Sequence, residues 1–275
     1  MTVDTPRGMR GQPLAVTGLN KSYGSHDVLR DLNLRVEAGE FVCIVGPSGA
    51  GKTTLLRCLS GLMPASSGAV RYGDAVVASP QRDIAVVFQD YRGSLMPWMT
   101  VRENVAFPLQ GAGVRKAERR ERADRSLAAV GLPDVGGKYP WQLSGGMQQR
   151  VAIARGLAYD APVLLMDEPF GSVDAQARFE LEDLVLDLRR RLGISIIVVT
   201  HDIDEAVYLG DRVVVLGGKP ATVVDTVDVD LGAERDQIAT RALPRFAALR
   251  TRVLTEIRGG RPAAAAARNP ITSAV

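Results

Sequence analysis

The first residues in the sequence that could do chemistry form a glycine-rich turn followed by a lysine and two threonines. In order they are Gly46, Pro47, Ser48, Gly49, Ala50, Gly51, Lys52, Thr53 and Thr54, which matches the spacing G-x-x-x-x-G-K-[ST]. Backbone N–H groups of such a turn can surround phosphate oxygens, and the N-terminus of a following helix adds positive potential. In this pattern the lysine reaches the β- and γ-phosphates and the first threonine hydroxyl ligates Mg²⁺. The turn therefore predicts a nucleotide site.

Two neighbouring acids form the second candidate. The apolar run Val163–Met166 predicts a buried strand, and Asp167 and Glu168 follow it directly. A strand that ends in acids places carboxylates at the C-terminal edge of the sheet, where ligands bind in open α/β sheets. We expect Asp167 to hold the metal through its water shell and Glu168 to polarise the attacking water as a general base. Alone, such a pair also fits a helix-capping role; together with the glycine-rich turn it indicates nucleotide hydrolysis.

A third anion site is suggested by the segment Leu143–Arg150, which reads LSGGMQQR. Ser144 can cap a helix whose first turn contains Gly145 and Gly146, so that free N–H groups face an anion. One chain has no second triphosphate to place there. We infer that this helix end faces the nucleotide of a second copy of the chain.

The hydrophobic pattern predicts the elements that position these groups. Strands are expected at residues 14–19, 32–36, 41–45, 69–72 and 84–88, with a helix at about 52–60. Helical patterns then follow at residues 101–107, 115–130 and 145–158. Beyond Asp160, strands at 163–166, 194–200 and 212–216 alternate with helices that begin after Asp174 and at Asp202. The predicted fold is an α/β core interrupted by a helical insertion at about residues 90–159.

Composition excludes several classes of protein. The chain has 275 residues, of which 46% are hydrophobic and 24% charged, as in an ordinary soluble globular protein and unlike collagen, a disulfide scaffold or a disordered chain. No apolar run approaches the roughly 20 residues of a spanning helix, and residues 1–13 lack the apolar region of a secretory signal. Two cysteines, Cys43 and Cys58, are too few for a disulfide framework and are expected to be buried. We expect the chain to be cytoplasmic, or to be bound to a partner that is not itself cytoplasmic.

The net charge of +3 is unevenly distributed. Residues 232–275 contain eight arginines and three acids, so the rest of the chain is slightly acidic. A neutral-to-acidic body with a basic end does not fit a nucleic-acid binder, whose basic residues usually line one folded face. We interpret the end as a solvated helix followed by a disordered terminus, with contact to an anionic membrane surface as the alternative.

In this order the motifs resemble those of the ATP-binding subunits of ATP-binding cassette (ABC) transporters, over about Leu14–Asp225. The family signature is LSGGQ, and Met147 replaces its glutamine here, which leaves the serine and the glycines intact. The resemblance implies an ATPase with a P-loop core, in which a mixed sheet is flanked by helices and joined by an antiparallel β subdomain. It also implies a cassette over residues 1–232 and a basic tail at residues 233–275.

The family pattern adds roles for residues that the spacing alone does not assign. It implies that Tyr23 stacks on adenine, that Gln89 in VVFQD touches the metal and senses the partner, and that His201 in VVTHD is the switch histidine near the γ-phosphate. Without the resemblance, Tyr23 would be interpreted as a strand residue and His201 as a polar cap. Residues 171–174, Gly-Ser-Val-Asp, stand where the family usually has small-Ala-Leu-Asp, and Asp174 is retained.

A narrower resemblance comes from the run Ser94–Val105, with the pattern LxPW-x-TV-x-x-NV. It is similar to the importer ATPases for nitrate, alkanesulfonates and taurine. Residues 235–250 also resemble the end of that group, although its usual RPRDR is replaced here by AERDQ. Pro97 and Trp98 are interpreted as a groove wall for a helix of the membrane subunit; the alternative is a packed corner of the helical insertion.

The resemblance implies a head-to-tail homodimer that closes on ATP and Mg²⁺ and drives a membrane permease at the cytoplasmic face of the cell membrane. A solute-binding protein would feed the permease, and no nucleic acid is expected. The alternatives are a soluble ABC ATPase of translation or chromosome maintenance, the ATPase of an exporter, and a P-loop kinase. The soluble ATPases resemble two fused cassettes or carry a long coiled-coil insertion, whereas this chain has one glycine-rich turn. The signature and Glu168 argue against a kinase.

Overall fold

The computed structural model describes residues 11–259. The expectations for the start of the chain and for a disordered end after the last helix therefore lie outside the described residues. Within residues 11–259, no helix combines the length and the apolar character that a bilayer span requires.

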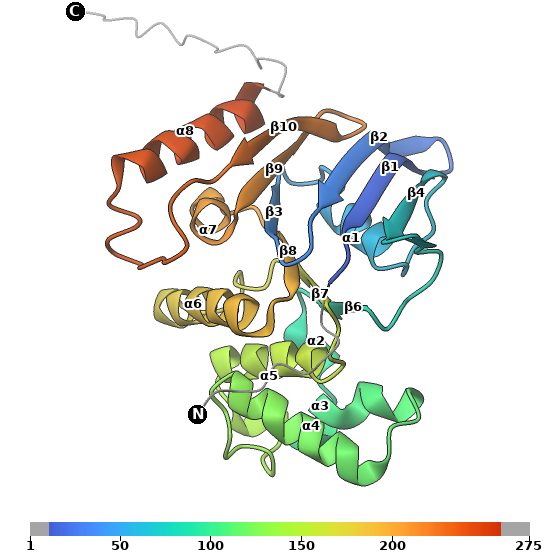
Figure 1. The fold of residues 1–275 in the computed structure, drawn as a ribbon, viewed down its shortest axis with the longest axis vertical. Coiled ribbons are helices and arrows are strands. Elements are labelled where there is room, and N and C mark those ends of the chain that lie inside the picture. The colour runs from blue at the N-terminus through green and yellow to red at the C-terminus, as the bar shows by residue number, and fades with distance from the viewer. Residues whose placement is uncertain (1–10, 260–275) are drawn as a thin grey trace, which may run out of the picture.

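A six-stranded sheet forms the centre of the fold, in the order β10-β9-β3-β8-β7-β6 (Figure 1). Its strands are β3 (Phe41–Val45), β6 (Ile84–Val87), β7 (Val163–Asp167), β8 (Ser195–Val199), β9 (Arg212–Gly217) and β10 (Thr222–Asp228). All neighbours pair in parallel except β9 and β10, which are antiparallel. Strands β3, β7 and β8 are buried along their whole length, which explains their unbroken apolar sequences.

Alternate residues of β3 belong to two hydrophobic clusters on opposite faces of this sheet. Cys43 belongs to the cluster formed with α6 (Ala175–Leu192) and the helical insertion, whereas Val42 and Ile44 belong to the cluster shared with α1 (Lys52–Leu59). Cys58 lies in the second cluster. Both cysteines are free and buried, as expected.

A second, antiparallel sheet has the order β2-β1-β4-β5 and covers α1. It consists of β1 (Leu14–Tyr23), β2 (His26–Val36), β4 (Ser67–Tyr72) and β5 (Ala75–Val76). Its buried side chains include Leu14, Val16 and Val70, which pack with Leu55 and Leu59 of α1. The mixed sheet and the antiparallel subdomain confirm the predicted fold class.

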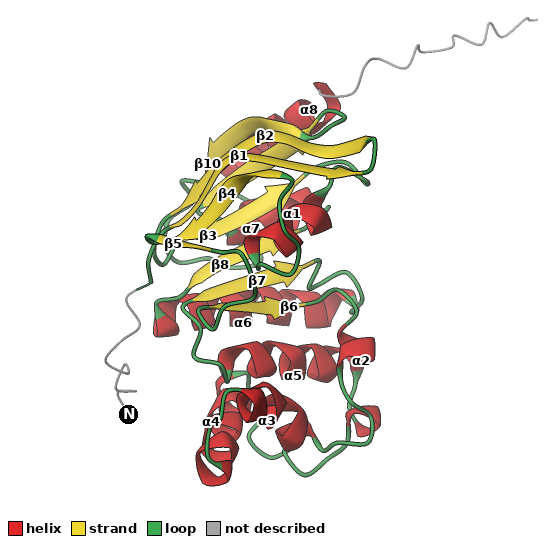
Figure 2. Ribbon diagram, turned by 90° about the vertical axis from the view of Figure 1, so that its right-hand side faces the viewer, coloured by secondary structure: helices red, strands yellow, loops and turns green. Residues whose placement is uncertain are grey.

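Between β6 and β7 the chain forms a helical layer below the sheet (Figure 2). It contains α2 (Tyr91–Ser94), α3 (Val101–Gly111), α4 (Lys116–Ala129), the short 3₁₀ turn Pro140–Gln142 and α5 (Gly145–Leu157). Thr100 and Glu103 form a reciprocal capping box that starts α3. These bounds agree with the helical insertion that the sequence predicts.

Three helices complete the fold: α6 (Ala175–Leu192), α7 (Ile203–Leu209) and α8 (Pro244–Gly259). Asp174 caps α6 by accepting a hydrogen bond from the Ala177 N–H at 2.9 Å, and Gly193, with φ of 62°, ends it. Asp202 caps α7 by accepting from the N–H groups of Asp204 and Glu205.

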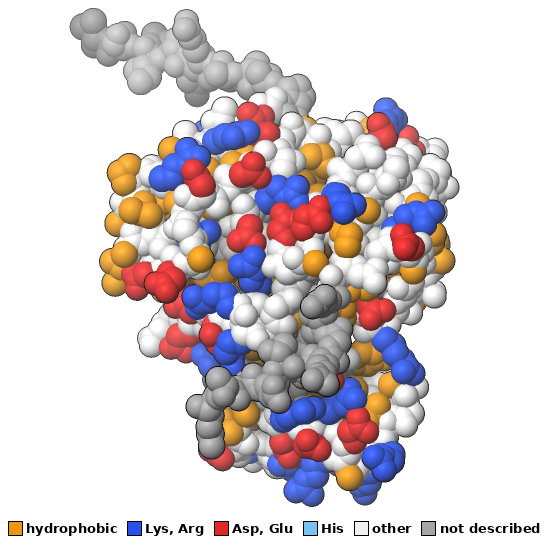
Figure 3. Space-filling view, viewed as in Figure 1, with side chains coloured by type: hydrophobic (Ala, Val, Ile, Leu, Met, Phe, Trp, Pro, Cys, Tyr) orange, Lys and Arg blue, Asp and Glu red, His pale blue; other side chains and the backbone are white. Residues whose placement is uncertain are grey.

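The C-terminal segment differs from the solvated helix that we expected. Three side chains of α8, Phe246, Leu249 and Val253, are buried in the main hydrophobic cluster, and the helix packs on α7, β9 and β10 (Figure 1). Their spacing of three and four residues puts them on one face of the helix. Basic and acidic side chains are intermingled on the face drawn in Figure 3, because arginines of this segment pair with acids of the body.

Candidate nucleotide site

The glycine-rich turn lies between the end of β3 and the start of α1, as the motif requires. Gly46 lies against β9, where an added Cβ would be 2.7 Å from the Leu216 carbonyl oxygen. Gly51 has φ of 75° and faces Val28 and Leu29 of β2, whose side chains an added Cβ would meet at 2.8 Å. Only glycine fits these two positions. Residues 47–50 form the turn between them, closed by a hydrogen bond from the Ala50 N–H to the Pro47 carbonyl, and Thr54 lies in the first turn of α1.

Lys52 directs its ammonium group into this turn. Its Nζ donates to the carbonyl oxygens of Gly46 at 2.9 Å and Pro47 at 3.2 Å. Burial lowers the pKa of Lys52, while the nearby carboxylates of Glu168 and Asp167 raise it. A cation held inside a ring of backbone groups is suited to bind phosphate.

Thr53 and Asp167 come together at the C-terminal edge of the sheet. The Thr53 hydroxyl donates to Oδ1 of Asp167 at 3.3 Å, although 114 residues separate them. Burial raises the pKa of the Asp167 carboxyl, and the hydrogen bond from Thr53 acts in the opposite direction. A hydroxyl oxygen beside a carboxylate is a donor set that suits Mg²⁺, so these two residues fit the expected metal.

The three residues expected to be catalytic, Gln89, Glu168 and His201, lie together, with Glu168 between the other two. Its Oε2 accepts a hydrogen bond from Gln89 Nε2 at 3.0 Å and lies 3.2 Å from His201 Nδ1. Gln89 follows β6 closely, Glu168 follows β7 and His201 follows β8, so three parallel strands deliver these side chains to one edge. Because the Gln89 amide nitrogen is directed to Glu168, its amide oxygen is left for a cation.

The backbone of Glu168 is in an uncommon conformation. Its φ is 44°, in the left-handed region that a residue with a side chain rarely adopts. The Glu168 N–H donates to the Val199 carbonyl at 2.8 Å, which ties it to the end of β8. Such strain persists only where surrounding structure fixes it, and it is frequent at active sites.

The signature residues lie at the start of α5, away from their own glycine-rich turn. Ser144 caps α5 by accepting from the Met147 N–H at 3.4 Å, and Gly145 and Gly146 form the first turn. An added Cβ on Gly146 would be 3.2 Å from Ala177 of α6. In Figure 2, α5 is in the helical layer and α1 is among the strands above. Between residues 144–146 and 46–54 of the described chain there is no hydrogen bond.

Tyr23 lies at the end of β1, where the hairpin with β2 begins. Its side chain is 46% exposed, and Lys21 Nζ lies 5.2 Å from its ring centroid. Its hydroxyl contacts Met63 Sδ at 2.9 Å. The same hairpin brings Val28 and Leu29 against Gly51, so the exposed ring belongs to the sheet that borders the glycine-rich turn.

A group of polar residues that the motifs do not predict lies behind His201. Thr200 and Glu205 are buried and hydrogen-bonded to each other at 2.7 Å, and Arg178 of α6 lies beside Glu205. Burial raises the pKa of Glu205 to about 7. The spacing of Thr200 and Glu205 around a helix start is typical of capping residues, so the sequence carries no signal that separates this group from an ordinary cap.

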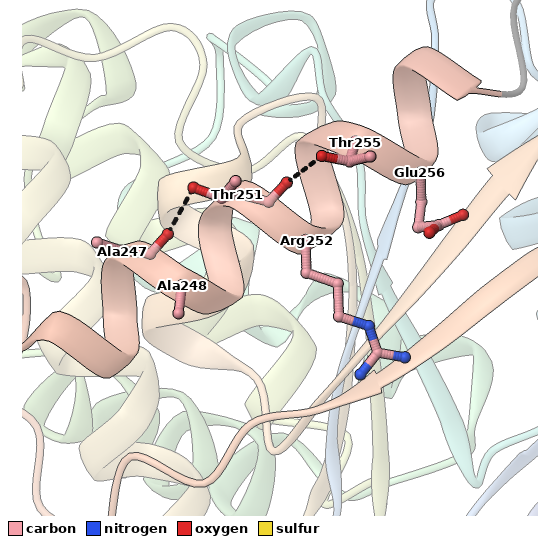
Figure 4. Close-up of a pocket in the computed structure, with 6 residues that line it drawn as sticks. All are labelled: Ala247, Ala248, Thr251, Arg252, Thr255 and Glu256. Carbon is pink, nitrogen blue, oxygen red and sulfur yellow. Dashed lines mark hydrogen bonds between the residues drawn. The ribbon is translucent and has the colours of Figure 1, made fainter.

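A separate shallow pocket lies on α8 and contains none of the expected site residues. Figure 4 shows its lining, which comes from one face of this helix: Ala247, Ala248, Thr251, Arg252, Thr255 and Glu256. The Thr251 and Thr255 hydroxyls donate to carbonyl oxygens one turn earlier in the same helix. The pocket offers no converging polar groups comparable to those around Glu168.

Comparisons with known proteins identify the family of this chain. The family model described as ABC transporter matches residues 29–171. The chain is 44% identical over 227 residues to a nitrate import ATP-binding protein of Synechocystis, covering 81% of this chain and 85% of the relative. It is 44% identical over 256 residues to an aliphatic sulfonates import ATP-binding protein of Burkholderia cenocepacia, covering 92% and 91%. It is 44% identical over 233 residues to a taurine import ATP-binding protein of Chromobacterium violaceum, covering 83% and 88%.

A solved structure matches as well. It is a dimeric post-hydrolysis state of the ATP-binding cassette MJ0796 bound to ADP and phosphate, with a TM-score of 0.69 and 34% identity, covering 79% of this chain and 99% of that one. The chain therefore belongs to the ABC transporter family. It is an ATP-binding ATPase of that family, as the order of its motifs predicts.

Proposed function

We propose that this chain is the ATP-hydrolysing subunit of an importer for nitrate, an alkanesulfonate, taurine or a similar small solute. The observation that carries the hydrolytic part is the convergence of Gln89, Glu168 and His201 beside Thr53 and Asp167. The import part is supported by the names of the three relatives and by the Pro97-Trp98 run. The cassette would span residues 1–232, with the helical insertion at about 90–159 and an appended segment at 233–275.

Each group of site residues would have a separate role in ATP binding and hydrolysis. The backbone N–H groups of residues 46–54, except at Pro47, and the Lys52 ammonium would bind the ATP phosphates, while the exposed Tyr23 ring is available to stack on adenine. Thr53, Asp167 and Gln89 would hold Mg²⁺, which supplies neutralisation of phosphate charge. Glu168 would accept a proton from the attacking water, and His201, whose Nδ1 lies 3.2 Å from Glu168 Oε2, would contact the γ-phosphate.

A second copy of the chain would complete each site. Ser144, Gly145 and Gly146 present a capped helix start with N–H groups suited to an anion, yet they lie away from their own glycine-rich turn. A head-to-tail homodimer would place them against the nucleotide of the partner. The dimeric MJ0796 cassette with ADP and phosphate supports dimerisation in general.

The permease would dock on the helical insertion, which would hold this subunit at the cytoplasmic face of the cell membrane. Trp98 is 73% exposed, which favours a contact surface over internal packing. The loop that carries Trp98 is held by the buried side chain of Asn104. This side chain accepts a hydrogen bond from the Met96 N–H and donates to the carbonyl oxygens of Met96, Met99 and Thr100. Beside it, an apolar cavity between the insertion and the sheet is lined by Phe88, Met96 and Phe107, among others. Phe88, which lines this cavity, directly precedes Gln89 in the sequence.

Co-purification tests this proposal. The full chain, expressed at native level with an affinity tag, should capture an integral membrane permease, and vesicles containing both should take up solute only with Mg-ATP and the solute-binding protein. Capture of ribosomes or chromosomal complexes would contradict the proposal in favour of a soluble ABC ATPase. Solute leaving the cytoplasmic side would identify an exporter.

A further inference from the structure

The buried hydroxyl of Thr200 closes a hydrogen-bonded turn around the backbone of His201. Thr200 is 1% exposed, and its hydroxyl accepts a hydrogen bond from the Asp202 N–H at 3.0 Å. His201 is the residue between them, so this bond closes a tight loop around it. The loop leaves the His201 side chain 64% exposed and directed at Glu168.

Glu205 orients this hydroxyl. The Thr200 Oγ1 donates its proton to Glu205 Oε2 at 2.7 Å, which leaves the oxygen lone pairs facing the Asp202 N–H. Glu205 lies in the first turn of α7 and is 4% exposed. A carboxyl oxygen can accept this hydrogen bond whether or not the group carries a proton, so the loop is fixed from inside the protein.

Arg178 of the neighbouring helix α6 places its guanidinium beside Glu205 and Asp202. Arg178 Nη1 lies 3.4 Å from Asp202 Oδ2, and its Nε lies 3.8 Å from Glu205 Oε1. Arg178 is in the first turns of α6, and its N–H donates to the carbonyl of Asp174, the residue that caps this helix. The Thr200 N–H donates to the Ile44 carbonyl at the end of β3. The loop around His201 is therefore held from β3, α6 and α7.

We propose that Glu205 is a positioning residue for hydrolysis: through the Thr200 hydroxyl it sets the place of His201 beside Glu168. The proposal rests on the proposed role of His201 in ATP hydrolysis. Glu205 does not face the nucleotide turn. Its removal should therefore lower the rate of the chemical step and leave ATP binding nearly unchanged, because displacing a catalytic group by about 1 Å can cost on the order of 100-fold in rate.

Steady-state ATPase kinetics of the full chain test this. Thr200→Val and Glu205→Ala should each lower kcat by about 10- to 100-fold with KM for ATP within about twofold of the wild type. Thr200→Ser, which keeps the hydroxyl, and Glu205→Gln, which keeps an acceptor oxygen, should recover most of the rate. The double variant Thr200→Val with Glu205→Ala should be no slower than the slower single variant, since both break one linkage.

Matched controls separate positioning from general damage to the fold. Thr240→Val removes another buried hydroxyl, which accepts from the Asp236 N–H, and Glu40→Gln removes a carboxylate paired with Arg212; both should keep wild-type kcat. Wild-type kcat in Thr200→Val and Glu205→Ala would overturn the proposal. An equal loss of kcat in the controls, tracking thermal stability, would also overturn it.

His201→Ala, measured in the same series, separates this proposal from the proposed function. If His201→Ala is slow and the Thr200 and Glu205 variants are normal, only the positioning role fails. If His201→Ala hydrolyses ATP at the wild-type rate, the proposed role of His201 fails, and the positioning role fails with it.

Discussion

His201 Nδ1 lies 3.2 Å from Oε2 of Glu168. The two residues are 33 positions apart in the sequence, and they meet because β7 and β8 are parallel neighbours whose C-terminal ends lie together. Oε2 of Glu168 also accepts from Gln89. A carboxylate flanked by an imidazole and an amide has its lone pairs directed and its position fixed, which is what a general base for water requires.

The exposed Trp98 predicts a loss of partner binding without a loss of stability. Trp98→Ala should change the free energy of unfolding by about 0.5 kcal/mol or less, as at other exposed positions, while it weakens capture of the permease and lowers transport more than basal ATPase. Ile238→Ala, at a residue 83% exposed on the C-terminal segment, is the matched control and should leave capture unchanged. A loss of roughly 3 to 5 kcal/mol with normal capture would instead make Trp98 a packing residue.

The start of α5 predicts dimerisation that depends on the nucleotide. In a Glu168→Gln background, light scattering should find a dimer with Mg-ATP and a monomer without it, and Ser144→Arg should prevent the dimer by placing a large side chain in the partner's phosphate site. Ala117→Arg adds the same charge to an exposed position of α4 and should still allow dimers. Normal dimerisation of Ser144→Arg would refute the composite site.

The C-terminal segment is predicted to contribute to stability through Arg241. Its guanidinium lies 2.6 Å from Oε2 of Glu182, which is fully buried, and 4.8 Å from the Tyr208 ring centroid. Arg241→Ala removes the cationic partner of that buried carboxylate, which among the described residues keeps only the hydrogen bond from Gln237. In urea unfolding it should cost about 3 to 5 kcal/mol of unfolding free energy.

The exposed pair of Arg245 and Asp230 provides the control for this measurement. Arg245→Ala should have a much smaller effect in urea unfolding, because solvent screens an exposed ion pair. Equal effects of the two substitutions would contradict a structural role for the buried pair.

Glu205 predicts a pH dependence of stability. Burial raises its pKa from 4.5 to about 7 in the folded chain, so the folded state keeps a proton that the unfolded state releases between these values. The stability from this group is therefore complete below about pH 4.5 and is lost as the pH rises through 7, by up to about 3 kcal/mol. Urea unfolding at pH 5 and pH 8 should show a smaller decrease for Glu205→Gln than for the wild type. Equal decreases would show that this carboxyl does not retain its proton on folding.

Much of the fold could be predicted because its strands are apolar runs and its helices have clear ends. Phe41–Val45 was predicted with its observed bounds, and Asp174 and Gly193 mark the two ends of α6. Strand β10 was not predicted because fewer than half of the residues in TVVDTVD are apolar and the strand lies at the sheet edge. The bulk of the expected nucleotide site could also be predicted, since its residues follow motifs of fixed spacing.

The remaining features depend on contacts between distant segments. Nothing in the sequence around Arg241 indicates a partner 59 residues earlier at Glu182, so the basic C-terminal segment was expected to be solvated. The left-handed backbone of Glu168 and the bond between Thr200 and Glu205 are likewise set by neighbouring strands and helices. Such contacts between distant segments cannot be predicted from local sequence patterns.

Glu168→Gln tests the central claim most directly, because it removes the general base and keeps the shape of the side chain. Binding of ATP and single-turnover hydrolysis should be measured on the same preparations of the wild type and the variant. The account predicts ATP binding close to that of the wild type and hydrolysis slower by about 10² to 10⁴. Hydrolysis by Glu168→Gln at nearly the wild-type rate would contradict the assignment of Glu168 as the base of this ATPase.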